Sequence, residues 1–137
     1  MAVSHQLTFA QLVNYDPGQP GITVDVTLQV YGGSVTCQAK VDTGSAFCIF
    51  SRKIGEDLGI NVESGMRRMV GTVTGTFAIY LHEINLSAAG YAFSVLAGFA
   101  EDGAFQRNVL GRRGFLEQVT LGLVDYDGKL YLSKYGE

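Results

Sequence analysis

The sequence has no tryptophan, little proline and histidine, and no long run of apolar residues. A membrane-spanning helix needs about 18 consecutive apolar residues, and no stretch approaches this length, so we expect no membrane partner. The net charge of -3 provides no basic surface for phosphate groups, so we expect no nucleic-acid partner. His5 and His82 have no ligand-forming neighbours at metal-site spacing, and nucleotide-binding glycine motifs are missing. We therefore expect neither a metal nor a cofactor.

Cysteine is also scarce, and the first residues carry neither a basic segment nor an apolar one. The start of the sequence therefore predicts no secretory signal and a cytoplasmic protein. In that compartment Cys37 and Cys48 are expected to be reduced and to act as small apolar residues. With 47% hydrophobic and 17% charged residues, the chain is expected to form one globular domain over residues 1–137.

Glycine, in contrast, is abundant, with eighteen residues that indicate many tight turns, as in an all-β barrel. Apolar and polar residues alternate over residues 22–31, which predicts a half-buried strand. Gly32-Gly33 is expected to form a hairpin turn into a strand over residues 34–42. Further strands are expected over residues 46–50, 66–70, 76–86, 91–97, 119–124 and 129–133.

Two short helices are expected between these strands. Ser51 can cap a helix over residues 52–58, which Gly59 would end. Gly55 inside that helix costs about 1 kcal/mol relative to alanine. A second helix of one or two turns is expected over residues 112–118.

The segment Val41-Asp42-Thr43-Gly44-Ser45 is the most informative motif in the sequence. Here an aspartate leaves an apolar strand and is followed by a hydroxyl, a flexible backbone position and a second hydroxyl. Such a carboxylate can be held near the interior, hydrogen-bonded and open to a cleft. The motif occurs once, because Asp102-Gly103 and Asp127-Gly128 lack the intervening hydroxyl residue and are predicted to be turns.

Two other stretches complete a pattern with this motif. They are the glycine-rich segment over residues 69–75 and Asn108-Val109-Leu110-Gly111-Arg112. In order and spacing, the three stretches closely resemble the retroviral-type aspartic proteases (retropepsins) and their bacterial relatives, over about residues 22–124. The resemblance implies an all-β fold, a closed acid-protease β-barrel with one or two short helices. It also implies a catalytic turn, a flap over the substrate and a short helix beneath the site.

The resemblance assigns a role to each residue of the catalytic turn. Asp42 would be the catalytic carboxylate, and Thr43 would make hydrogen bonds across a subunit interface. Gly44 would let the backbone approach the carboxylate. A hydroxyl at Ser45 can bond the ionised carboxylate and favour its charged form, which predicts activity at mildly acidic pH.

The substrate-binding residues implied by the resemblance lie in the flap and beside the third stretch. A peptide would be held in an extended form by main-chain hydrogen bonds. The alternative for the hairpin is an ordinary surface turn with a flexible tip. The implied substrate-binding residues are Val70, Gly71, Thr72, Val73, Thr74, Gly75 and Val109.

The chemistry of an aspartic protease requires two carboxylates that share a proton, one as general acid and one as general base. A chain with one such motif supplies one carboxylate. The active unit is therefore expected to be a homodimer in which Asp42 meets its copy at the two-fold axis and a polypeptide is the substrate.

Two departures from the family pattern keep other functions open. Lys40 stands two residues before Asp42, where retropepsins usually have an aliphatic residue; it either extends to solvent or biases specificity. Arg112 matches an arginine whose aspartate partner is replaced here by Ala46. The alternatives are a non-catalytic dimeric β domain that binds peptides or acts as a scaffold, and a monomeric β domain with a chance motif.

Overall fold

The computed structural model describes residues 2–137 and is built mainly from β-strands. Within these residues it has ten strands, one α-helix and three short 3-10 helices. The strands are β1 (Gln11–Asn14), β2 (Thr23–Val30), β3 (Gly33–Val41), β4 (Ile49–Phe50), β5 (Met66–Thr72), β6 (Gly75–Ala88), β7 (Tyr91–Ala100), β8 (Val109–Leu110), β9 (Val119–Val124) and β10 (Lys129–Lys134). The helices are α1 (Arg52–Asp57), η1 (Val62–Ser64), η2 (Leu116–Gln118) and η3 (Asp125–Asp127).

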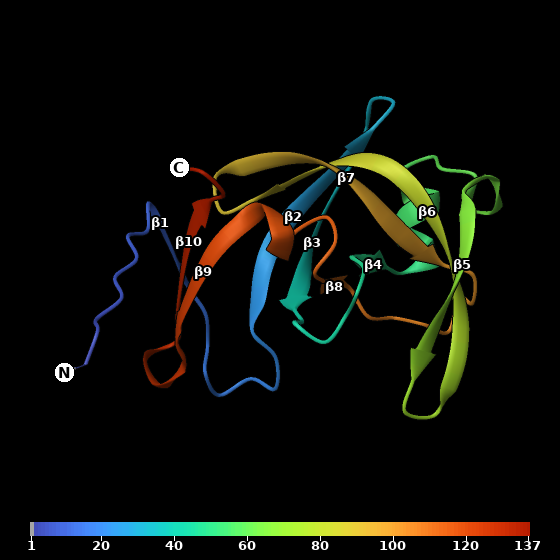
Figure 1. Ribbon diagram of the computed structural model, residues 1–137. Coiled ribbons are helices and arrows are strands. Elements are labelled where there is room, and N and C mark those ends of the chain that lie inside the picture. The colour runs from blue at the N-terminus through green and yellow to red at the C-terminus, as the bar shows by residue number, and fades with distance from the viewer. Residues whose placement is uncertain (1) are drawn as a thin grey trace.

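Seven strands form one sheet in the order β2-β3-β8-β4-β7-β6-β5 (Figure 1). β2 also pairs with β6, so six of the strands close into a ring and β5 extends from β6 outside it. Closure pairs the edges of the six ring strands, which would otherwise be open to pairing with other chains, while β5 pairs with β6 alone. The expected all-β fold with a closed barrel is thereby confirmed.

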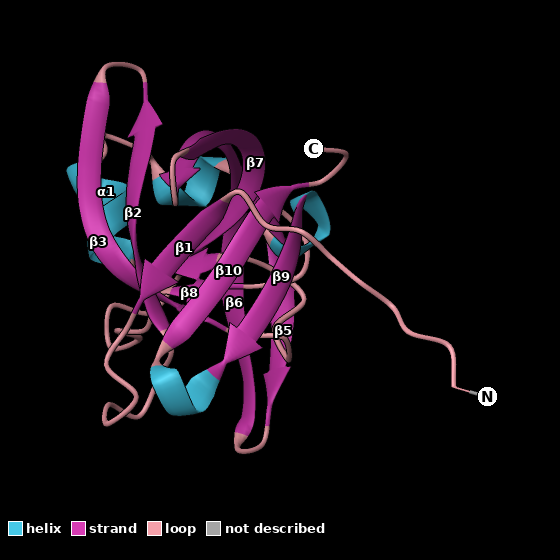
Figure 2. Ribbon diagram, turned by 90° about the vertical axis from the view of Figure 1, so that its left-hand side faces the viewer, coloured by secondary structure: helices cyan, strands magenta, loops and turns pink. Residues whose placement is uncertain are grey.

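A second sheet of three strands, in the order β1-β10-β9, packs beside the barrel (Figure 2). Its register pairs Gln11 with Leu132, two residues at opposite ends of the sequence. Leu130 and Leu132 of β10 are fully buried, and Val13 and Leu121 pack against the same core. Both chain ends lie on this side of the molecule, away from the β5–β6 hairpin (Figure 1).

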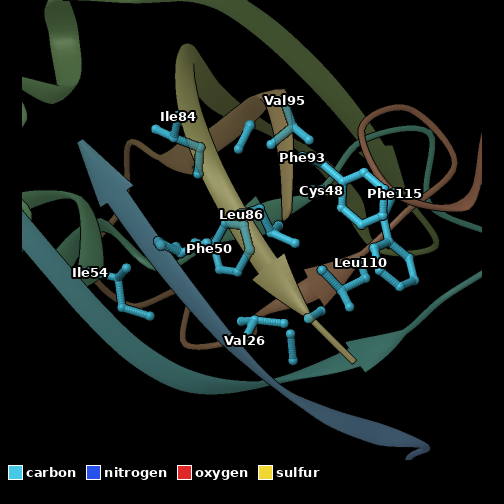
Figure 3. Packing of buried hydrophobic residues seen from close by; sticks show 14 of the residues in the cluster. Val26, Cys48, Phe50, Ile54, Ile84, Leu86, Phe93, Val95, Leu110 and Phe115 are labelled. Carbon is cyan, nitrogen blue, oxygen red and sulfur yellow. The ribbon is translucent and has the colours of Figure 1, made fainter. Parts of the chain in front are cut away.

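The main core fills the interior of the barrel with apolar side chains from its successive strands (Figure 3). Val26, Phe50, Leu86 and Leu110 come from β2, β4, β6 and β8 and are almost inaccessible to solvent. Burying each such side chain stabilises the fold by about 2 kcal/mol. The ends of β3 and β8 are thereby held firmly, and the functional segments begin at these ends.

The first helix forms as expected. Ser51 Oγ accepts a hydrogen bond from Ile54 N at 3.4 Å, and Gly59 has a φ of 82° just after the helix. Close packing explains the glycine at position 55, since a Cβ atom there would stand 3.0 Å from the Phe99 ring. The glycine lets α1 pack closely on β7.

Three sequence-based expectations are corrected. The first hairpin turns at Tyr31-Gly32 and not at Gly32-Gly33, and both turn residues have positive φ, as a two-residue hairpin turn requires. The strand expected over residues 46–50 is only Ile49–Phe50. The second helix is reduced to η2, because Gly114 has a φ of 98° and interrupts a helical path from residue 112.

Candidate active site

Asp42 directly follows β3, and the pairing of β3 with β8 fixes its backbone. Asp42 N donates to Leu110 O at 3.0 Å. The chain then turns tightly, with Gly44 N donating to Asp42 Oδ1 at 2.9 Å and Ser45 N donating to Asp42 O at 3.2 Å. A backbone donor to one carboxylate oxygen orients the carboxyl group and leaves the other oxygen free for chemistry. Asp42 is therefore a positioned, partly buried carboxyl group.

The segment after β8 supports the turn from below. Arg112 N donates to Ser45 O at 2.8 Å, and Arg113 N donates to Ala46 O at 2.9 Å. The two chain segments approach so closely at Gly111 that a Cβ atom would stand 2.6 Å from Ser45 O. Two of the three stretches found in the sequence thus form one hydrogen-bonded unit.

Asp42 faces a cleft of about 340 Å³ that has three walls. These are the turn after β3, the β5–β6 hairpin, and the segment from Phe105 to Val109 that leads into β8. The glycine-rich stretch over residues 69–75 therefore contributes part of this lining, through Met69, Val70, Gly71 and Thr72. The lining residues are Asp42, Gly44, Ser45, Ala46, Phe47, Ile49, Met69, Val70, Gly71, Thr72, Phe77, Phe105, Arg107 and Val109.

The structure brings most of the predicted site residues to this cleft, but not all. Thr43 is exposed beside it. Val73, Thr74 and Gly75 form the tip of the hairpin beyond the lining, and Val73 is fully exposed. The residues of the prediction that do line the cleft are Asp42, Gly44, Ser45, Val70, Gly71, Thr72 and Val109.

The cleft has an apolar floor that is separate from the main core. Ile49, Ile79, Leu81 and Val109 form a small buried cluster, and four further apolar residues pack against it. Two of these, Phe77 and Phe105, stack with their ring centroids 4.7 Å apart. The floor suits a bulky apolar side chain. The four surrounding residues are Phe47, Val70, Phe77 and Phe105.

Sequence reasoning missed Phe47, Ile49, Phe105 and Arg107 as site residues. Phe105 and Arg107 lie in a loop between β7 and β8, where the sequence has no periodicity and no motif. Ile49 belongs to the strand expected over residues 46–50, but these residues are all apolar, so no alternation indicates which side faces the cleft. The proximity of all four residues to Asp42 appears only once the barrel is closed.

Side-chain hydrogen bonds and an ion pair hold the hairpin over the cleft at its tip and at its base. Thr72 Oγ1 donates to Gly75 O at 3.0 Å, and Thr72 pairs with Gly75 in the strand register. At the base, Tyr80 Oη donates to Glu101 Oε2 at 2.7 Å, while Arg67 Nε lies 3.5 Å from the same oxygen. The hydrogen bond to the Glu101 carboxylate raises the pKa of Tyr80, so that phenol stays protonated.

Ser45 differs from its expected role, whereas Lys40 follows one of the two alternatives left open for it. Ser45 Oγ donates to Phe47 O at 2.7 Å. A hydroxyl has one O–H donor, so this bond replaces the expected bond to the Asp42 carboxylate. Lys40 is exposed, and its side chain packs along Gly21 rather than lining the cleft, which agrees with a lysine that extends to solvent.

Neither a metal-binding cluster nor a membrane helix is found in the described part of the chain. Residues 2–137 contain no group of three or more histidine, cysteine, aspartate or glutamate side chains placed to hold an ion. His82 lies instead with Nε2 2.8 Å from Val62 O. Among the same residues, no helix has the length and apolar character needed to cross a bilayer.

Comparison with known proteins agrees with the geometry. The model of a family described as aspartyl protease matches residues 24–114. The matched range begins in β2 and ends just after β8, so it contains the Asp42 turn, the β5–β6 hairpin and the Gly111-Arg112 segment. No curated protein matches the chain. The family description does not separate viral from bacterial members, so the resemblance to the bacterial members stays a prediction.

Proposed function

The chain belongs to the aspartyl protease family, and on that premise we propose that it is an aspartic endopeptidase active as a homodimer. One observation carries the proposal. The Asp42 carboxylate, held by the Gly44 N–H, opens into a cleft with an apolar floor and a hairpin across it. Because the motif occurs once in the sequence, the second carboxylate must come from a second copy of the chain.

In the proposed reaction, two Asp42 carboxyl groups hold one proton between them. Like charges at about 3 Å cannot both ionise, so one group stays protonated. The ionised group removes a proton from a water molecule, whose oxygen attacks the carbonyl carbon of the peptide bond. The other group protonates the carbonyl oxygen and, as the intermediate collapses, a proton passes to the leaving amine. The pair gains and loses protons as a unit.

The face for the second subunit follows from this chemistry. The turn after β3 and the tip of the β5–β6 hairpin lie on the same side of the molecule, the lower side in Figure 1. Thr43 is exposed there, and its side chain makes no hydrogen bond within residues 2–137. Its hydroxyl is therefore free to bond across the axis, in the role that the resemblance implies.

The hairpin is proposed to act as the flap. An extended peptide would lie between it and the floor, with Val70, Gly71 and Thr72 above and Val109 below. Val73, Thr74 and Gly75 at the tip would reach across the bound peptide towards the second subunit. Closure would exclude water other than the attacking molecule.

A specific observation also favours the alternative, a non-catalytic dimeric β domain that binds peptides or acts as a scaffold. The Ser45 hydroxyl is bonded to Phe47 O rather than to Asp42. Arg112 forms no ion pair with any other described residue, and the position of its family partner is occupied by Ala46. Two supports of the catalytic turn are thus missing.

Cleavage of a peptide library at pH 4 to 7 by the wild-type chain and by Asp42→Asn distinguishes the two functions. The enzyme is expected to cut within peptides, and Asp42→Asn is expected to fold and dimerise but cut nothing. Sedimentation at several concentrations checks the dimer. A wild-type dimer that cleaves no peptide and binds no hydroxyl-bearing transition-state mimic would leave the binding domain as the function.

A further inference from the structure

Arg107 is the one cation among the described residues that line the cleft, and Asp42 is the one anion. Arg107 lies in the segment between β7 and β8, two residues after Phe105 and two before Val109. It also borders a second hollow, beyond the cleft, that reaches the tip of the β5–β6 hairpin. A substrate side chain that extends past the apolar floor in that direction would approach Arg107.

Arg107 forms no ion pair with any described residue. Ion pairs within residues 2–137 engage Arg52, Lys53 and Arg67, and none engages Arg107. Asp102 borders the second hollow, but its Oδ1 accepts a hydrogen bond from Ala104 N at 2.8 Å and closes its own turn. The chain as a whole carries a net charge of -3, so Arg107 is a local positive charge on a protein that is negative overall.

We infer, resting on the proposed peptidase function, that Arg107 is a specificity-determining residue that selects an aspartate or glutamate side chain in the substrate. The recognised sequence has a bulky apolar residue on the Phe77 and Phe105 floor with an acidic residue close to it. A guanidinium group presents two parallel N–H donors that match a carboxylate, which a lysine or an amide cannot reproduce.

Four other unpaired basic residues are placed less well for this role. Lys40 packs along Gly21 outside the cleft. Arg112 and Arg113 lie beyond Ala46 in a hollow that they share with the carboxylate of Glu117. The flap strand β5 carries Arg68, which lies outside the lining and whose Nη1 donates to Arg67 O at 3.1 Å.

Paired peptides test the inference. Each pair has the same cleavable sequence and differs by one glutamate or glutamine near the apolar residue, scanned along the peptide. For the wild type, kcat/KM is expected to be about fivefold higher with glutamate at one position, the factor that about 1 kcal/mol corresponds to. In Arg107→Gln this ratio is expected to fall to about one. Salt is expected to reduce the wild-type ratio because the pair is partly exposed.

A matched control distinguishes the effect of the charge at position 107 from the effect of the protein's total charge. Lys53→Gln removes the same unit of charge from α1, where the side chain is 80% exposed, and is expected to keep the ratio. Arg107→Met repeats the test with an apolar side chain if Arg107→Gln does not fold. Equal cleavage of glutamate and glutamine peptides by the wild type, or an unchanged ratio in Arg107→Gln, overturns the inference and leaves the peptidase intact. Failure of the wild type to cleave any peptide overturns the proposed function itself.

Discussion

Gly111 packs so closely against Phe47 that a Cβ atom on Gly111 would overlap the Phe47 carbonyl oxygen. This contact joins the segment that leaves the Asp42 turn to the segment that leaves β8. The neighbouring hydrogen bonds from Arg112 N to Ser45 O and from Arg113 N to Ala46 O depend on the same close approach. The glycine of the third stretch is therefore a condition for the shape of the Asp42 turn.

Replacing Gly111 with alanine is expected to lower the free energy of unfolding by about 3 kcal/mol or more, because the added methyl group meets backbone atoms that cannot move aside. Urea unfolding measures the change. Gly103→Ala is the matched control, since a Cβ atom there has nothing within 4 Å. Equal stability of the two variants would contradict the close packing.

Local patterns predicted the parts of the fold that depend on neighbouring residues. Alternation over residues 22–31 identified β2, and Ser51 and Gly59 marked the ends of α1. The Asp42 turn was also found from its own sequence, because Gly44 and Ser45 of the same motif supply the N–H groups that bond to Asp42. The single-domain organisation and the cytoplasmic location stay predictions.

The sequence could not show the features that depend on contacts between residues far apart in the chain. The pairing of Gln11 with Leu132 joins residues far apart in the chain and has no local signature. Phe105 reaches the cleft through stacking on Phe77, which depends on closure of the barrel. The Ser45 hydroxyl bonds to Phe47 O, an acceptor that depends on the path of the backbone and not on a residue type.

The tip of the hairpin is expected to affect catalysis more than stability. Thr72→Val removes the hydrogen bond from Thr72 Oγ1 to Gly75 O and loosens the tip. Because the residue is exposed, the free energy of unfolding is expected to change by less than about 0.5 kcal/mol. We expect kcat/KM on a peptide substrate to fall by about threefold to tenfold, since a mobile flap holds the substrate less well.

Thr76→Val is the control for this prediction, because it makes the same change on the same hairpin and its hydroxyl forms no side-chain hydrogen bond within residues 2–137. Thr76→Val should retain near wild-type kcat/KM. If both variants lose activity equally, the Thr72 bond has no special part in ordering the hairpin.

Cys48 is expected to make stability depend on pH in the alkaline range. Burial, aided by the Glu117 carboxylate and partly offset by a hydrogen bond with the Gly111 backbone, raises the pKa of Cys48 to about 11 from its ordinary 9.0. The unfolded thiol therefore loses its proton first as pH rises. The stabilisation is complete below pH 9 and is lost towards pH 11, by about 2 to 3 kcal/mol.

Urea unfolding at pH 8 and pH 10.5 measures this loss, with Cys48→Ala as the variant that lacks the thiol. The difference in stability between the two proteins should shrink at the higher pH. Alkylation provides a second measurement, because the native Cys48 thiol should react far more slowly than the unfolded one. Rapid alkylation of Cys48 in the native protein would contradict its burial.

The single Asp42 motif predicts a quantitative result when active and inactive chains are mixed. If two copies build one site, a dimer with one Asp42→Asn chain has a single carboxyl group and cannot share a proton across the axis. In an equal mixture at fixed total concentration, random pairing makes about a quarter of the dimers wild type, so activity should fall to about a quarter. Thr43→Ser, which keeps the hydroxyl proposed to bond across the axis, serves as a mixing partner that should leave activity well above that value. Activity of one half in the Asp42→Asn mixture would mean that each chain acts alone, and the carboxylate at Asp42 would then need a partner from within its own chain.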